Sequence, residues 1–188
     1  MANEVTNFID LENRNIYICG EITTSQISEI CFALITMLDK DDYEDTNIKD
    51  YERDPINIYI TSYGGELDPS WGLIDIILNS QTPIYTYCLG CAYSAAFNIF
   101  LAGHLRFAYP HSTFLYHQLS TGAYGKFMDM YEKVNALLED QKSIEEYVIS
   151  RTKITLEELH QNKTNKQDWY FNFDDAIKYG IINGLEEE

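Results

Sequence analysis

Three residues of this sequence have types and surroundings that could support nucleophilic hydrolysis. Ser94 follows a strand-like run at 83–88 and precedes an apolar, helix-like run at 95–102, and α/β proteins place nucleophiles where a strand leads into a helix. His117 comes 23 residues later, and Asp168 comes 51 residues after that. A serine hydroxyl attacks once a base takes its proton, histidine titrates near neutral pH, and a carboxylate orients the imidazole. These three residues are therefore candidates for the triad of a serine hydrolase.

A pair of glycines could stabilise the charge that such a reaction develops. Gly64 and Gly65 precede Ser94, with Gly65 lying 29 positions before the serine, and glycine lets a backbone approach a substrate closely. An oxyanion hole is built from N–H donors, each worth about 2.7–4 kcal/mol. We expect the N–H of Gly65 to be one donor. We expect the N–H of Ala95 to be the other, because it starts a predicted helix and helix N-termini favour anions.

Each of these residues also has an ordinary structural explanation. Ser94 could cap a helix, the glycine pair at 64–65 could form a turn, His117 could be a partly buried histidine, and Asp168 could be solvated. Spacing in the sequence does not show that the four points meet in space. Residue chemistry alone therefore leaves both explanations open.

The hydrophobic pattern predicts one α/β domain over residues 1–188, built of alternating strands and helices that would position these residues. The expected strands lie at 15–19, 56–61, 83–88 and 113–117. The expected helices lie at 27–38, 71–78, 95–102, 127–148, 155–158 and 173–179. We expect the acidic stretch at 39–54 to be a loop or small insertion. We expect residues 140–143 to kink the long helix or to expose its middle.

Composition excludes several functional classes. The formal net charge of −17 opposes binding to nucleic acid, which needs basic patches, and docking on anionic membranes. Residues 1–14 lack the pattern of a secretory signal, and no run reaches the ~18 apolar residues of a membrane span. We therefore expect no nucleic-acid partner, no membrane association and a cytoplasmic location.

The four cysteines predict reduced, buried thiols. Cys19, Cys31, Cys88 and Cys91 lie in apolar contexts and not in the loops of a disulfide framework. Cys88 and Cys91 form a C-x-x-C pair, but a zinc site would need two further ligands at similar spacing, and the sequence has none. We expect no metal site.

Four short motifs occur along the chain. Residues 59–65 read Y-I-T-S-Y-G-G, and residues 88–94 read C-L-G-C-A-Y-S. Residues 109–118 end in S-T-F-L-Y-H-Q, and residues 168–183 begin D-W-Y and end Y-G-I-I-N. From residue 15 to the end, the chain resembles the proteolytic subunit of the Clp protease family (caseinolytic protease P, serine peptidase family S14). The corresponding family patterns are Y-I-N-S-P-G-G, C-x-G-x-A-x-S, S-x-x-x-x-H-Q, and an aspartate with an aromatic residue followed by Y-G-[LI]-[IV]-D.

The resemblance implies a Clp-protease or crotonase-like α/β fold and roles for particular residues. Ser94 would be the nucleophile, His117 the general base and Asp168 its orienting acid, with the N–H groups of Gly65 and Ala95 as the oxyanion hole. It also implies that a polypeptide substrate binds as an extended strand. The residues that would bind it are Gly64, Glu66, Leu67, Gly122 and Tyr124. No metal or organic cofactor is implied, because hydrolysis by a triad needs none.

The resemblance further implies an assembly and a partner. The family forms heptameric rings, stacked in pairs as a tetradecamer around a chamber, and usually receives unfolded chains from an ATP-dependent Clp unfoldase. A helix at 126–152 would be the handle that joins two rings, and residues 1–14 would be the N-terminal segment. We therefore expect a homo-oligomeric serine endopeptidase that hydrolyses unfolded or extended polypeptides inside a chamber.

The chain departs from the family pattern at several points. Tyr63 replaces the proline before the two glycines, and Leu119 replaces a common proline after the histidine and glutamine. Residues 166–167 replace an acid–arginine pair that makes contacts between rings in the family. The acidic segment at 39–54 is longer than usual, and the N-terminal segment at 1–14 is short. These departures leave the double ring and the coupling to an unfoldase open.

Three hypotheses follow. The first is an active Clp-type peptidase in an oligomeric chamber, favoured because all triad residue types and the glycine pair are present. The second is a Clp-like processing or maturation protease that acts on one dedicated substrate without an unfoldase. The third is a non-catalytic scaffold subunit, or a crotonase-like protein that binds acyl thioesters, although the sequence has no clear coenzyme A site.

Overall fold

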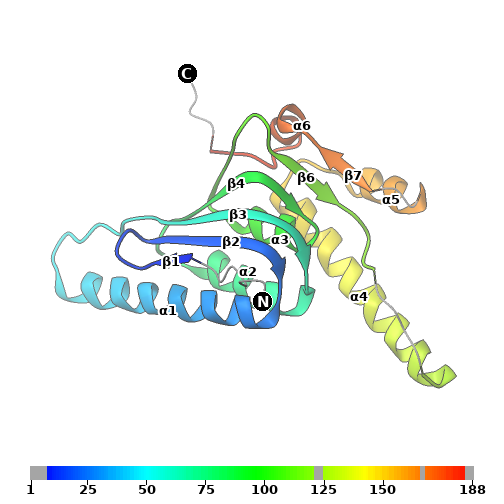
Figure 1. Cartoon of the computed structure of the whole chain (residues 1–188), viewed down its shortest axis with the longest axis horizontal. Coiled ribbons are helices and arrows are strands. Elements are labelled where there is room, and N and C mark those ends of the chain that lie inside the picture. Colours follow the sequence, from blue (N-terminus) through cyan, green and yellow to red (C-terminus); the bar gives the residue numbers. More distant parts are fainter. Residues whose placement is uncertain (1–7, 121–124, 166–167, 185–188) are drawn as a thin grey trace, which may run out of the picture.

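The computed structural model describes residues 8–120, 125–165 and 168–184, and these residues form alternating strands and helices (Figure 1). The strands are β1 (Phe8–Asp10), β2 (Asn15–Ile22), β3 (Ile56–Gly65), β4 (Ile84–Tyr93), β5 (Leu105–Ala108), β6 (Thr113–Tyr116) and β7 (Trp169–Phe171). The helices are α1 (Thr24–Asn47), α2 (Leu67–Asn79), α3 (Ala95–Ala102), α4 (Phe127–Arg151), α5 (Leu156–Asn165) and α6 (Phe173–Lys178). The prediction of an α/β fold is confirmed.

One sheet joins the strands in the order β1-β2-β3-β4-β6-β7, with β5 paired to β4 beside this path. The inner pairs β2–β3, β3–β4 and β4–β6 are parallel, whereas β1 and β7 join antiparallel. Strand β4 is long enough to pair with β5 along its first half and with β6 along its second half. Because β4 and β6 are parallel neighbours, the residues that follow them, Ser94 and His117, lie at the same edge of the sheet.

Alternating isoleucines explain why one face of this sheet is buried. Every second residue of a strand points to the same face, and Ile56, Ile58 and Ile60 of β3 are fully buried. Helices α1, α2 and α3 pack against this face (Figure 1). All eight residues of α3 are buried. The helix that begins at the candidate nucleophile is therefore embedded in the hydrophobic core.

The other face of the inner strands carries a row of aromatic rings. Tyr17, Tyr59, Tyr87 and Phe107 come from four adjacent strands and stack with centroid distances of 4.8, 4.8 and 4.9 Å. The three tyrosines are half-buried. The inner strands are therefore covered by helices on one face and by half-buried aromatic side chains on the other.

The acidic stretch at 39–54 was expected to be a loop, and this is wrong for its first part, because α1 continues to Asn47. Asp41 explains the continuation. Its carboxylate is fully buried and accepts hydrogen bonds from Arg14 at 2.6 and 3.1 Å and from the Thr82 hydroxyl at 2.6 Å. These contacts with residues distant in the sequence bury Asp41 on the inner face of α1, so packing overrides the polar character of the stretch.

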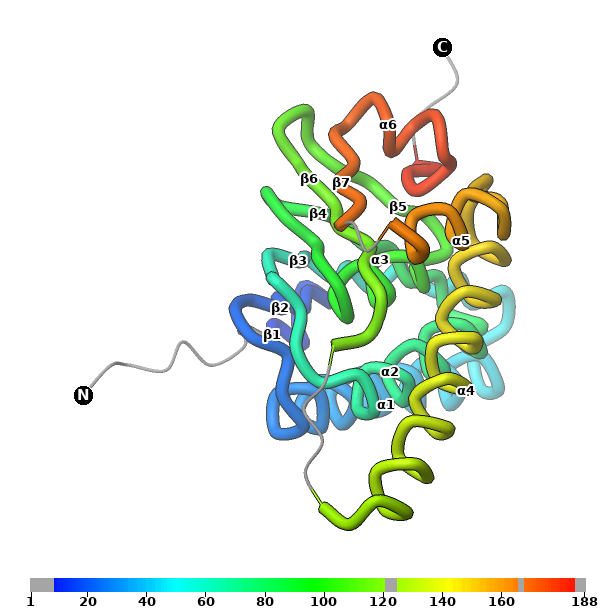
Figure 2. The backbone as a smooth tube through the Cα atoms, turned by 90° about the vertical axis from the view of Figure 1, so that its right-hand side faces the viewer, coloured from blue at the N-terminus to red at the C-terminus, as the bar shows by residue number. Residues whose placement is uncertain are grey.

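The long helix predicted for 126–152 is present as α4. Figures 1 and 2 show its N-terminal half extending away from the sheet, while its C-terminal half lies against the body and reaches α5. At 140–143 the helix is continuous, and its middle is exposed in part as expected, since Lys142 and Ser143 are exposed whereas Gln141 is buried. The exposed half carries large apolar side chains at Phe127, Met128, Tyr131, Val134 and Leu138.

Smaller features also differ from expectation. The short strands β1, β5 and β7 were not predicted, since three or four residues give too little alternation to recognise. The last helix ends before Gly180, which has φ +65°, as the sequence indicated.

Within the described ranges, none of the helices combines the length and apolar character that a membrane crossing requires.

Candidate active site

Ser94 lies at a sharp turn between the end of β4 and the start of α3. Its backbone has φ +55° and ψ −124°, a region that costs a residue with a side chain roughly 1–3 kcal/mol. The turn is held because the Ser94 N–H donates to the Leu115 carbonyl of β6 at 2.9 Å. Ser94 occupies the cap position of α3, but its hydroxyl makes no capping hydrogen bond there. Helix capping therefore does not account for this hydroxyl.

The glycine pair at the end of β3 packs directly against this turn. Gly64 has φ +97°, and a β-carbon added there would lie 2.7 Å from the Ser94 β-carbon and 2.8 Å from the Tyr93 carbonyl oxygen. Gly65 has φ +153°, and an added β-carbon would overlap the Ile22 carbonyl oxygen. Only glycine fits at either position, which explains both residues in physical terms.

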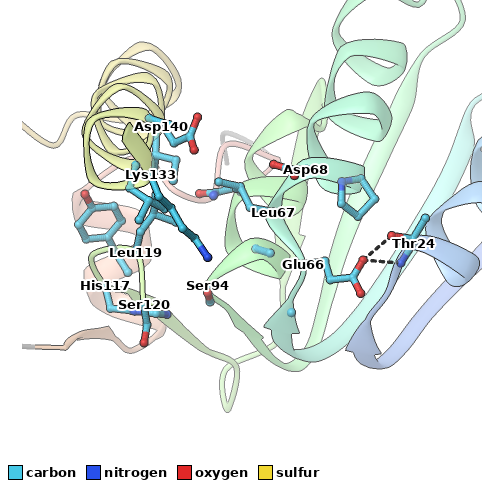
Figure 3. Close-up of a pocket in the computed structure, with 18 residues that line it drawn as sticks. Thr24, Glu66, Leu67, Asp68, Ser94, His117, Leu119, Ser120, Lys133 and Asp140 are labelled. Carbon is cyan, nitrogen blue, oxygen red and sulfur yellow. Dashed lines mark hydrogen bonds between the residues drawn. The ribbon is translucent and has the colours of Figure 1, made fainter. Parts of the chain in front are cut away.

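His117 follows Tyr116, the last residue of β6, and is half-buried. Together with Ser94 it lines a cavity of about 700 Å³. Figure 3 labels both among the residues that line it. No hydrogen bond joins them among the described parts of the chain. The structure thus brings the candidate nucleophile and base into one cavity, but without a hydrogen bond between their side chains in the described residues.

Asp168 precedes β7, and strand register relates it to His117. In the antiparallel pair β6–β7, Leu115 lies opposite Tyr170 and Tyr116 lies opposite Trp169. Continuing this register by one residue places Asp168 opposite His117. Directly opposite residues of an antiparallel pair have neighbouring β-carbons on the same face. The register therefore favours a contact between the two side chains.

The side chain of Asp168 is nevertheless exposed and does not line the cavity with Ser94. It lines a second cavity of about 350 Å³, with Glu158, Trp169 and Tyr179 among its neighbours. Within the described ranges, no hydrogen bond links Asp168 to His117. The structure brings two of the three candidate triad residues into one cavity and leaves the third beside it.

The remaining candidate residues have different positions. Gly65, Ala95, Glu66 and Leu67 line the cavity with Ser94. The Glu66 carboxylate accepts hydrogen bonds from the Thr24 N–H at 2.9 Å and from the Thr24 hydroxyl, so it points toward the start of α1 (Figure 3). Gly64 packs behind Ser94 and does not line the cavity. The candidates Gly122 and Tyr124 lie outside the described residues.

One wall of the cavity comes from α4, which sequence reasoning did not connect with the site. Lys133, Leu137, Asp140 and Ile144 line it, at steps of three or four residues that place them on one face of a helix. The sequence predicted a helix that contains all four residues. Which neighbour that face would meet depends on long-range packing, and no local signal in the sequence contains that information.

The C-x-x-C pair lies within β4, in the core. Cys88 and Cys91 are free and buried, and burial raises the pKa of the Cys88 thiol to about 12. A thiol with a raised pKa is a poor nucleophile and a poor metal ligand. In the part of the chain that the structure describes, no three histidine, cysteine or acidic side chains are grouped so that they could hold a metal ion.

Comparison with known proteins identifies the family. The family model described as Clp protease matches residues 2–188. The chain is 28% identical to ATP-dependent Clp protease proteolytic subunit 2 of Treponema pallidum (strain Nichols), over 95% of this chain and 84% of that protein. It is 27% identical to proteolytic subunit 1 of Shouchella clausii (strain KSM-K16), over 93% and 86%, and 29% identical to proteolytic subunit 2 of Borreliella burgdorferi, over 92% and 82%. The chain therefore belongs to the Clp protease family of serine peptidases.

Proposed function

We propose that this protein is a serine endopeptidase that hydrolyses peptide bonds of unfolded or extended polypeptides. The observation that carries this proposal is the position of Ser94. Its hydroxyl is not used as a helix cap, its backbone is held in a strained turn, and it lines the same cavity as His117. These features support an active enzyme over a non-catalytic scaffold, because a scaffold has no use for a strained serine beside a histidine.

In this proposal His117 takes the proton of the Ser94 hydroxyl while the serine oxygen attacks the scissile carbonyl carbon. The N–H groups of Gly65 and Ala95 donate to the oxyanion that forms. Support for Ala95 comes from its place at the start of α3, where helical N–H groups have no partner within the helix. His117 then gives its proton to the leaving amine. A water molecule repeats the sequence on the acyl-enzyme and releases Ser94 with its proton restored.

Asp168 is the proposed orienting acid for the His117 imidazole. Support comes from the β6–β7 register, which places the two residues opposite each other just past the last paired positions. A rotation of the Asp168 side chain would be enough to change its neighbours, since this side chain is exposed. We propose that the carboxylate turns toward the imidazole in the active assembly.

The cavity walls suggest how a substrate is held. We propose that the peptide lies extended beside the segment 64–67, with one of its side chains directed at the apolar part of the cavity. Leu67, Leu119, Leu137 and Ile144 supply that apolar surface. Glu66 would act through the backbone, because its carboxylate is tied to Thr24 and holds the segment against the start of α1.

We further propose that the protein works as a homo-oligomer with a chamber, built from heptameric rings that stack as a tetradecamer. The relatives are named as proteolytic subunits of an ATP-dependent Clp protease. The word subunit supports an assembly, and ATP dependence supports an unfoldase partner. The exposed apolar half of α4 supports its use as the contact between rings, since a free monomer would leave Phe127 75% exposed. Sedimentation analysis of the purified protein tests the assembly directly.

Intact-mass analysis after treatment with a fluorophosphonate tests the catalytic proposal. We expect a single adduct on the wild type and none on a Ser94→Ala variant. Ser143→Ala is a matched control, because Ser143 is an exposed serine of α4 whose hydroxyl only donates to the Glu139 carbonyl, and it should label like the wild type. The absence of an adduct on the assembled wild type, or an adduct that persists in Ser94→Ala, would overturn the proposal.

A further inference from the structure

A buried glutamine of α4 contacts the chain on both sides of His117. The Oε1 of Gln141 accepts a hydrogen bond from the Leu119 N–H at 2.8 Å, and its Nε2 donates to the Tyr116 hydroxyl at 3.1 Å. Gln141 is 5% exposed, and Tyr116 is also buried. One amide side chain therefore bridges the residue before His117 and the residue two positions after it.

A carboxylate sets the orientation of this amide. The Nε2 of Gln141 also donates to Glu145 at 3.0 Å. An ionised carboxylate only accepts hydrogen bonds, so a reversed amide would place oxygen against oxygen at Glu145. It would also place N–H against N–H at Leu119. Glu145 thus holds the glutamine in the one orientation that accepts from Leu119.

Helix α5 in turn holds the carboxylate. Glu145 is buried, and Lys163 Nζ lies 3.1 Å from one carboxylate oxygen while His160 Nε2 lies 3.5 Å from the other. Figure 2 shows α5 beside the C-terminal half of α4. Breaking a buried charge pair by removing one partner is costly. The orientation of Gln141 is therefore fixed by a chain of contacts that begins on α5 and ends on the segment carrying His117.

The residue at position 119 makes this contact chemically possible. Leucine has a backbone N–H, whereas proline, which is common after the histidine and glutamine of similar sequences, has none. Tyr116 adds a stable second contact, because burial, together with the charge of Glu145, raises the pKa of its hydroxyl to about 12. Both contacts persist over the whole neutral range of pH.

We propose that Gln141 and Glu145 are positioning residues that hold His117 at the distance from Ser94 that proton transfer needs. The inference rests on the proposed function, since it assumes that His117 is the base. A displacement of about 1 Å at a reacting group costs on the order of 10²-fold in rate. Hydrogen bonds to Gln141 at Tyr116 and Leu119 hold the segment on both sides of His117, so they resist such a displacement.

Fluorophosphonate labelling kinetics of the full-length assembled protein test this role. The variants are Gln141→Met, which keeps the side-chain length but removes both hydrogen-bonding groups, and Glu145→Gln, which is milder and removes the charge. Glu146→Gln is the matched control, because the neighbouring Glu146 is exposed and pairs with Lys142 at 3.8 Å at the surface. We expect the first-order rate constant of Ser94 labelling to fall about 10- to 100-fold in Gln141→Met and less in Glu145→Gln. The concentration of reagent at half-maximal rate should stay unchanged.

The rate constant separates positioning from loss of stability. A variant that only unfolds more easily lowers the fraction of protein that is labelled, whereas a displaced base slows the labelling of the folded fraction. Wild-type rate constants in both Gln141→Met and Glu145→Gln would overturn the positioning role while leaving the proposed function intact. A wild type that does not label at Ser94 would overturn both.

Discussion

Gly64 lies in β3 and Ser94 follows the end of β4, yet a β-carbon added to Gly64 would lie only 2.7 Å from the β-carbon of Ser94. The end of β3 is therefore pressed against the turn that carries the candidate nucleophile. The carbonyl of Leu115, from β6, holds the same turn from the other side through the Ser94 N–H. Two neighbouring strands thus fix a backbone conformation that serine would not adopt alone.

Replacing Gly64 by alanine should displace this turn. The added methyl group meets backbone atoms at 2.8 and 3.2 Å besides the serine β-carbon, and φ is +97°. We expect the rate of peptide hydrolysis to fall by at least about 10²-fold, because small displacements of a nucleophile have effects of that size. Gly72→Ala is the control, since an added β-carbon there meets nothing within 4 Å and alanine favours a helix. Equal activity of both variants would contradict the close packing described here.

Replacing Asp168 by asparagine tests the register argument. If the carboxylate orients His117, we expect the rate of hydrolysis to fall by roughly 10⁴-fold, as in other triads. Asp174→Asn is the matched control, because Asp174 is an exposed aspartate near the same strand. Asp175 is unsuited to that purpose, since it accepts from the Asn172 N–H in a capping box of α6. Retention of activity in Asp168→Asn would require a different orienting group.

The pH dependence of hydrolysis tests the proposed base. Histidine must be neutral to accept a proton, so we expect kcat/KM to fall at acidic pH. The structure requires a control for folding, because burial lowers the pKa of His104, whose Nδ1 accepts from the Ile84 N–H at 3.0 Å. Rates should be measured where circular dichroism shows a folded protein. A constant rate from pH 5 to 8 would exclude histidine as the base.

The parts of this fold that sequence could predict are those with local causes. Alternating isoleucines predicted β3, and the run of small and apolar residues predicted α3 with the same bounds as observed. The turn at Ser94 was also predictable, because it lies where one pattern gives way to the other. The length of α1 could not be predicted, because Asp41 contacts Arg14 and Thr82, which lie 27 and 41 residues away in the sequence. A polar residue buried by distant partners looks like a surface residue in the sequence.

The candidate site divides in the same way. Ser94, His117 and the glycines could be named from residue type and spacing, because the strand ends that carry them have local signatures. Sequence could not predict the cavity wall from α4 or the contacts of Gln141 and Glu145. Both depend on how α4 packs on the segment after β6. A buried glutamine in a long amphipathic helix has no local feature that distinguishes it from an exposed one.

Asp41→Asn should destabilise the protein and remove part of its acid sensitivity. Burial alone would raise the pKa of Asp41, but hydrogen bonds from Arg14 and Thr82 outweigh this effect and lower the pKa below its ordinary value. A lowered pKa means that the folded state favours the ionised form, so the stabilisation is complete above the unfolded value of about 3.9 and is lost as pH falls through the folded value. Removing one partner of a buried pair costs about 3–5 kcal/mol.

Thermal melting monitored between pH 2 and 7 measures this contribution. At pH 7 we expect Asp41→Asn to melt roughly 10 °C below the wild type, given the usual relation between free energy and melting temperature for a chain of this length. The difference should shrink as pH falls below about 4, because the unfolded chain then takes up a proton that the folded Asp41 resists, and the contribution is gone once pH has fallen through the lowered pKa of the folded state. Asp42→Asn is the control, since Asp42 is 65% exposed and pairs with Arg53 at the surface, where ion pairs contribute little. If both variants melt like the wild type at pH 7, then Asp41 does not anchor the end of α1, and the length of this helix needs another cause.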